Sequence, residues 1–214
     1  MAKLLIIGAS RGIGLETVKV ALRDGHRVRA LARSAASIPI ENADLEKLSG
    51  NALDNDTVKN ALEGVDVVIQ TLGVDMSLRA IIKPTTLFSR STRILVDAMK
   101  AAGVNRLVAV TGLGAGDSRG HGGLLYDGLV FPLLLKRVYD DKDVQEWIIR
   151  SSELDWTIVR PGLLTNGPAT GRYRVLTKPQ EWRVGLISRA DVADFLVRQV
   201  DDHALIRATP LLVN

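Results

Sequence analysis

The chain has 214 residues, of which 46% are hydrophobic and 24% are charged, and this balance excludes an intrinsically disordered protein. It contains no cysteine, which excludes disulfides, thiolate catalysis and cysteine metal ligands and fits a reducing cytoplasm. The formal net charge of +4 is scattered rather than gathered into a basic stripe with aromatic residues, so we expect small anionic ligands and no nucleic acid.

The composition also limits the location and organisation of the protein. The three histidines, at positions 26, 121 and 203, have no paired spacing, so we expect no metal site. No apolar run approaches ~18 residues and the N-terminus already has the pattern of a strand, so we expect neither a membrane span nor a signal peptide. We therefore expect a cytoplasmic protein with one domain over residues 1–214, as a monomer or weak dimer.

The N-terminal residues predict a nucleotide-binding turn. Four apolar residues at 4–7 have the pattern of a strand buried on both faces of a parallel sheet, and residues 15–22 have that of a helix. The glycines between them build an anion site, because the backbone N–H groups and the helix dipole point toward a phosphate. The spacing G-x-x-x-G-x-G also fits an ordinary flexible turn, but its place between strand and helix favours dinucleotide binding. The expected contacts are Gly8, Ser10, Arg11, Gly12, Ile13 and Gly14.

The next strand, at residues 26–31, predicts which nucleotide is preferred. A site selective for NAD places an acid near its end to bind the ribose 2′-hydroxyl, and no Asp or Glu lies between positions 27 and 40. Arg33 offers a planar fork for a 2′-phosphate, Ser34 adds a hydroxyl, and Arg11 can approach from the glycine turn. Two solvated surface arginines are the alternative, but these positions favour NADP(H).

The rest of the chain alternates between strand and helix patterns. Gly103 ends one predicted helix, and Ser188 with Asp191 has the pattern of a cap that begins another. Six such alternations predict an α/β protein with a doubly wound parallel sheet. The expected strands are 45–51, 66–71, 106–111 and 155–160, and the expected helices are 56–63, 86–102, 136–151 and 192–200.

The predicted strand ends supply further candidate ligand contacts, because ligands bind at the carboxyl ends of parallel strands. Thr111 ends a strand near the expected nicotinamide, although it can equally satisfy a local backbone group. Asp54 can edge the adenine or cap a helix. Loops 74–85 and 112–127 are expected to overhang the site and contact the substrate. The remaining expected cofactor contacts are Asn51, Ala52, Leu53, Thr71, Leu72, Gly73, Pro161 and Gly162.

Several motifs together resemble one superfamily. They are residues 8–14 (GASRGIG), 97–104 (DAMKAAGV), 152–162 (SELDWTIVRPG) and 188–193 (SRADVA). They resemble the atypical short-chain dehydrogenases/reductases, in particular the group of biliverdin-IXβ reductase (flavin reductase) and the NmrA-like NAD(P)-binding proteins. The resemblance implies a Rossmann fold, NADP(H), and reduction of a flavin or another conjugated acceptor.

One position departs from the superfamily, whose conventional members carry Tyr-x-x-x-Lys with the tyrosine as proton donor. Lys142 aligns as the lysine, where it can hold the ribose hydroxyls or polarise the acceptor, but the tyrosine position is Val138. Tyr139 lies one residue further on, which rotates it by ~100° around the helix. Tyr139 is therefore a candidate acid or a packing residue, and His121 is either an alternative proton source or a solvated loop histidine.

We expect an NADPH-dependent reductase that transfers hydride to a flavin, a quinone or a similar conjugated small molecule, with Thr111, Lys142 and Tyr139 as candidate catalytic residues. A non-catalytic NADP(H) redox sensor of the NmrA-like type is the main alternative, which the displaced tyrosine favours. A sugar-nucleotide epimerase or dehydratase is a further alternative, but only residues 163–214 remain for a sugar-nucleotide subdomain.

Overall fold

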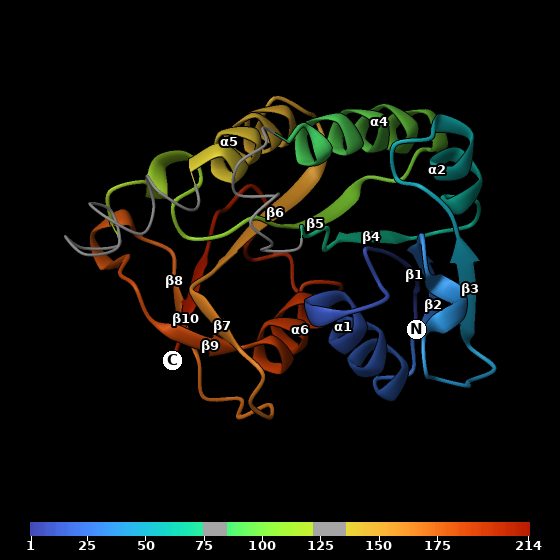
Figure 1. Cartoon of the computed structure of the whole chain (residues 1–214), viewed down its shortest axis with the longest axis horizontal. Coiled ribbons are helices and arrows are strands. Elements are labelled where there is room, and N and C mark those ends of the chain that lie inside the picture. Colours follow the sequence, from blue (N-terminus) through green and yellow to red (C-terminus); the bar gives the residue numbers. More distant parts are fainter. Residues whose placement is uncertain (75–84, 122–135) are drawn as a thin grey trace.

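A mostly parallel sheet of eight strands forms the centre of the protein (Figure 1). The computed structural model describes residues 1–74, 85–121 and 136–214. The strands run in the order β3-β2-β1-β4-β5-β6-β10-β8, and among these described strands only β8 is antiparallel to its neighbour. Their bounds are β1 Lys3–Ile7, β2 Arg27–Ala32, β3 Leu45–Ser49, β4 Val67–Gln70, β5 Arg106–Val110, β6 Asp155–Pro161, β8 Arg174–Leu176 and β10 Leu211–Val213.

The predicted doubly wound fold is confirmed, and the strand order reverses between β1 and β4. In open α/β sheets such a reversal opens a crevice at the carboxyl ends of the strands. The sequence analysis missed four short strands near the C-terminus, including β7 (Leu163–Thr165) and β9 (Leu186–Ser188), which pair in a separate two-stranded sheet.

Helices cover both faces of the sheet (Figure 1). Helices α1 (Gly12–Arg23) and α6 (Arg189–Arg198) lie on one face, and α2 (Asn55–Ala61), α4 (Leu87–Ala102) and α5 (Lys136–Arg150) on the other. Alternate residues of β1 point to opposite faces, so Leu4 and Ile6 pack under α1 while Leu5 and Ile7 pack under α2 and α4. This double burial explains the run of four apolar residues.

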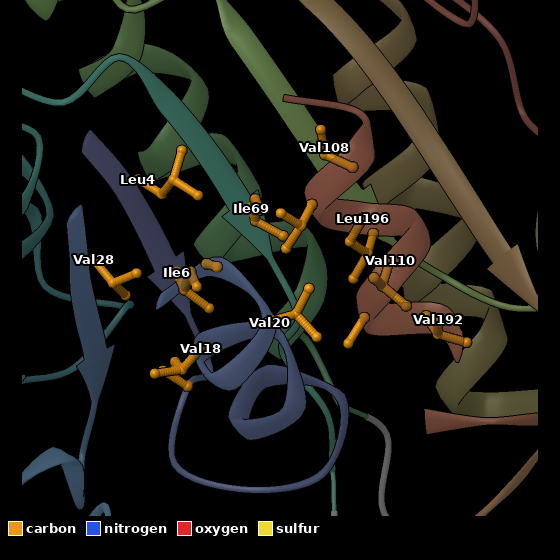
Figure 2. Packing of buried hydrophobic residues seen from close by; sticks show 14 of the residues in the cluster. Leu4, Ile6, Val18, Val20, Val28, Ile69, Val108, Val110, Val192 and Leu196 are labelled. Carbon is orange, nitrogen blue, oxygen red and sulfur yellow. The ribbon is translucent and has the colours of Figure 1, made fainter. Parts of the chain in front are cut away.

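The face beneath α1 and α6 holds the glycine turn in place. Figure 2 shows side chains of both helices packed over four strands: Leu4, Ile6, Val18, Val20, Val28, Ile69, Val108, Val110, Val192 and Leu196. Complete burial of one such side chain contributes about 1.5–3 kcal/mol. The start of α1 is therefore anchored on a rigid base.

Caps fix the ends of several helices. The Ser188 hydroxyl accepts from the Asp191 backbone N–H at 2.9 Å, which confirms the predicted cap of α6. Asp54 accepts from the Thr57 N–H at 2.7 Å and so caps α2, which is the second of its two expected roles. Gly103, with φ 69°, ends α4 as predicted. The carboxylate of Asp141 caps α4 from the neighbouring α5, a contact that no local pattern indicates.

Candidate functional site

A cavity of about 1020 Å³ lies along the carboxyl ends of β1, β2, β4, β5 and β6. All the predicted cofactor contacts except Gly14 line it, as do Lys142 and Tyr139. Its described lining contains Arg11, Arg33, Lys142 and Arg189 and no acidic residue. A cavity with this charge suits a polyanionic ligand such as a phosphorylated dinucleotide.

The glycine turn forms one end of the cavity. Gly8 has φ +88°, and a Cβ there would lie 2.9 Å from the Thr71 carbonyl oxygen, so the turn needs glycine on both grounds. A Cβ on Gly14 would collide with the Gly8 carbonyl oxygen. Gly14 therefore brings α1 close to β1 and shapes the turn without lining the cavity.

The N-terminus of α1 faces this end of the cavity. The helix begins at Gly12, its cap residue Arg11 makes no side-chain capping bond, and its first turn carries no acid. The first N–H groups of a helix lack partners within it and favour a negative charge. The turn therefore fits the pyrophosphate of a dinucleotide.

Arg189 is a cavity residue that the sequence analysis did not identify. It is the first residue of α6, and its Nε lies 3.8 Å from the position that a Cβ on Gly12 would take. Its Nη1 donates to the Asn166 side-chain oxygen at 2.7 Å, which holds the guanidinium beside the turn. Its place directly after the predicted Ser188 cap was the one available signal.

The strand ends carry the adenosine side of the expected site. Arg33 and Ser34 follow β2, are exposed, and line the cavity as expected for 2′-phosphate contacts. Asn51 follows β3, where its side chain accepts from the Leu53 N–H at 3.1 Å and shapes the turn. Thr71 follows β4 and donates its hydroxyl to the Ile7 carbonyl at 2.9 Å. The strand-end residues thus lie on one edge, next to the glycine turn.

The opposite end of the cavity contains the candidate catalytic residues. The Lys142 ammonium donates to the Thr111 carbonyl oxygen and lies 4.9 Å from the Phe88 ring centroid and 5.5 Å from that of Tyr139. Burial of the ammonium lowers the pKa of Lys142 to about 8, against the opposing effect of the Glu146 carboxylate. Lys142 is therefore held as a cation at neutral pH, at a fixed point beside Thr111.

Tyr139 also lies in this part of the cavity, so its one-residue offset does not remove it. Its hydroxyl lies over Gly112, the residue that follows Thr111. The structure thus brings Thr111, Lys142 and Tyr139 together as the sequence analysis expected of candidate catalytic residues.

A buried ion pair between Glu146 and Arg160 holds the Thr111 side chain in place. The Thr111 hydroxyl donates to Glu146 Oε1 at 2.8 Å, and Arg160 donates to both oxygens of Glu146, at 3.0 Å and 2.6 Å. Arg160 also donates to Asp117 at 2.6 Å, which ties the loop after β5 to the pair. Burial is the largest single effect on the Arg160 guanidinium and lowers its pKa, but the hydrogen bonds and charges of Glu146 and Asp117 together outweigh it and raise the pKa. The Thr111 hydroxyl is thus satisfied by a side chain rather than by the local backbone.

His121 does not line the cavity. Its ring packs edge-on against Trp182, with the centroids 5.4 Å apart. Of the two loops expected to cover the site, residues 75–84 and 122–127 lie outside the described residues. In the described parts of the chain, no cluster of His, Asp or Glu could hold a metal ion, and no helix is long and apolar enough to cross a membrane.

Comparison with known proteins assigns the family. YhfK, an uncharacterized sugar epimerase of Bacillus subtilis (strain 168), is 28% identical over 207 residues, which cover 94% of this chain and 88% of YhfK. The structure of ChuY, an anaerobilin reductase from Escherichia coli O157:H7, is 26% identical with a TM-score of 0.79, covering 99% of this chain and 96% of ChuY.

A short-chain dehydrogenase/reductase from Veillonella parvula DSM 2008, in complex with NADP, shares the fold at 18% identity, with a TM-score of 0.79 over 100% of this chain and 94% of its own. A family model described as NAD(P)H-binding matches residues 8–203, from the glycine turn to beyond α6. Because that match spans nearly the whole chain, the protein belongs to the NAD(P)H-binding family.

Proposed function

We propose that this protein is an NADPH-dependent reductase of the short-chain dehydrogenase/reductase type that reduces a flat, conjugated small molecule. The observation that carries the proposal is the continuous cavity, free of acidic residues in its described lining, that joins the glycine turn and Arg33 to Lys142 and Tyr139. One end suits a phosphorylated dinucleotide, and the other carries groups that can handle a proton.

The cofactor is held along this cavity by the strand ends. The pyrophosphate binds the N–H groups of the glycine turn, with Arg189 beside them. Arg33 takes the 2′-phosphate in a planar fork, with Ser34 and Arg11 around it. The Lys142 ammonium, fixed on the Thr111 carbonyl, reaches the ribose next to the nicotinamide. This arrangement favours NADPH over NADH because Arg33 faces the 2′ position and the described lining of the cavity carries no carboxylate.

When bound, the reduced nicotinamide supplies the hydride, while the protein aligns the acceptor and controls charge and water. The apolar lining of the cavity includes Leu72, Leu87, Phe88, Val138 and Leu164, and the Phe88 ring lies 4.9 Å from the Lys142 ammonium. Such a lining suits an aromatic or conjugated acceptor and keeps water from the reacting atoms. A conjugated acceptor can also delocalise the arriving charge. ChuY, which resembles this chain over 99% of its residues, is an anaerobilin reductase, and this favours a reductase here.

The test is NADPH oxidation by the purified protein with a panel of flavins, quinones, linear tetrapyrroles and simple carbonyls. We expect turnover with at least one conjugated acceptor and little with simple carbonyls. A Gly8→Val variant serves as the control, because its side chain would collide with the Thr71 carbonyl group and distort the glycine turn. If no acceptor is reduced while NADPH and NADP⁺ bind with clearly different affinities, the protein is a redox sensor instead, because a sensor needs that difference.

A further inference from the structure

Every hydrogen-bond donor of Thr111 has a partner inside the protein. Its backbone N–H donates to the Val159 carbonyl oxygen at 2.9 Å, and its hydroxyl donates to Glu146 Oε1 at 2.8 Å. Threonine has no third donor, because its hydroxyl carries a single proton. Thr111 is buried and lines the cavity. Towards a molecule bound there it can therefore only accept a hydrogen bond.

The direction of the bond between Thr111 and Glu146 is fixed by Arg160. The guanidinium donates to both carboxylate oxygens of Glu146, at 3.0 Å and 2.6 Å, and both members of this ion pair are buried. A carboxylate in such a pair is ionised and has lone pairs but no proton, so the proton in the bond belongs to Thr111. Turning that proton toward the cavity would take a partner from a buried carboxylate, which costs free energy. The hydroxyl oxygen thus has lone pairs, but no proton, to offer a ligand.

A hydrogen-bond donor lies directly beside this oxygen. The Lys142 ammonium donates to the Thr111 carbonyl oxygen and has two further N–H groups, of which one suffices for the cofactor ribose. A substrate that satisfies both residues presents an N–H next to a C=O, as a lactam or a cyclic imide does. Quinones and simple ketones bring only acceptor oxygens, and these would leave Thr111 without a partner.

We propose that Thr111 is a specificity-determining residue whose hydroxyl oxygen accepts a hydrogen bond from a ring N–H of the substrate, so that the site selects a conjugated lactam or cyclic imide. The proposal rests on the proposed reductase function and narrows its substrate class. The nicotinamide carboxamide also carries an N–H next to a C=O, so the test has to separate the substrate from the cofactor.

The test compares two flavins that differ in one donor. Lumiflavin carries an imide N–H at N3, and 3-methyllumiflavin carries a methyl group in its place. Their dissociation constants are measured by flavin fluorescence with saturating NADP⁺, which has no hydride to transfer. We expect the methylated flavin to bind at least about tenfold more weakly, because it leaves the buried Thr111 oxygen unpaired. No binding of lumiflavin, or equal affinities for the two flavins, would overturn the proposal.

Two substitutions separate the hydrogen bond from the bulk of the added methyl group. Thr111→Val keeps the shape of the side chain without its hydroxyl, so the preference for lumiflavin should be lost. Thr111→Ser is the matched control, because it keeps the hydroxyl and should keep the preference. If Thr111→Val discriminates between the two flavins as well as the unchanged protein does, the hydroxyl does not select the substrate.

A cofactor analogue tests the carboxamide as the partner of Thr111. In the 3-acetylpyridine analogue of NADP⁺ a methyl group replaces the amide NH₂, and its binding should change equally in the unchanged protein and in Thr111→Val. A loss of affinity confined to the unchanged protein would assign the contact to the cofactor and overturn the proposal. If the protein reduces no acceptor but prefers lumiflavin through Thr111, the reductase function fails and the specificity of the site stands.

Discussion

Replacing Glu146 with alanine should destabilise the protein strongly, because it leaves a buried cation without its main partner. Glu146 is 1% exposed and Arg160 0%, and the pair is joined by hydrogen bonds of 2.6 Å and 3.0 Å. Removing one member of a buried ion pair costs about 3–5 kcal/mol. Arg160 keeps its bond to Asp117, so we expect the lower end, about 3 kcal/mol. In a protein of this size such a loss lowers the melting temperature by about 6–12 °C.

The assay is urea denaturation followed by circular dichroism, with the free energy of unfolding compared at a common slope. Asp117→Asn is the matched control. It touches the same guanidinium, but the Asp117 side chain is 54% exposed, so its loss should cost less than about 1 kcal/mol. If Glu146→Ala is as mild as Asp117→Asn, the buried pair does not support the wall of the site and the reasoning is wrong.

Two further predictions concern cofactor binding. Calorimetric titration should show that NADPH binds at least ~10-fold more tightly than NADH, a difference of about 1.4 kcal/mol. Arg33→Asp should erase or reverse this preference. Equal affinities for the two cofactors in the unchanged protein would contradict the prediction. Burial lowers the pKa of Lys142 to about 8, so the ammonium is present below that pH and lost above it. NADPH affinity should therefore fall about tenfold from about pH 7 to about pH 9, while Lys142→Met should bind more weakly without this dependence. A fall of the same size in Lys142→Met would assign it to another group.

The sequence predicted the sheet because its signals are local. Residues 4–7 are apolar throughout, since both faces of β1 are covered, and Gly103 and Ser188 mark helix ends by their own chemistry. The short strands β7 to β10 were missed for the opposite reason. Each has only three residues and forms by pairing with strands distant in the sequence, as Leu211 does with Arg160 of β6.

In the candidate site, too, local sequence signals identified some residues and missed the contacts between distant ones. Strand-end residues such as Thr71 and Thr111 were identified because the carboxyl ends of parallel strands share one edge. Two other contacts of the site join residues far apart in the chain. They are the hydrogen bond from Thr111 to Glu146 and the packing of the Tyr139 hydroxyl against Gly112. Nothing in a single sequence shows such contacts. Whether the cavity residues bind the cofactor and catalyse stays a prediction.

Hydride transfer itself tests the central claim most directly. The measurement is the rate of NADPH oxidation in a single turnover with the preferred acceptor, using NADPH that carries deuterium at one or the other position of nicotinamide C4. A cofactor bound in one orientation in this cavity should show slower oxidation with deuterium at one position and an unchanged rate with deuterium at the other. An absence of oxidation with every acceptor, or a rate that ignores both labels, would contradict a reductase that transfers hydride from this site.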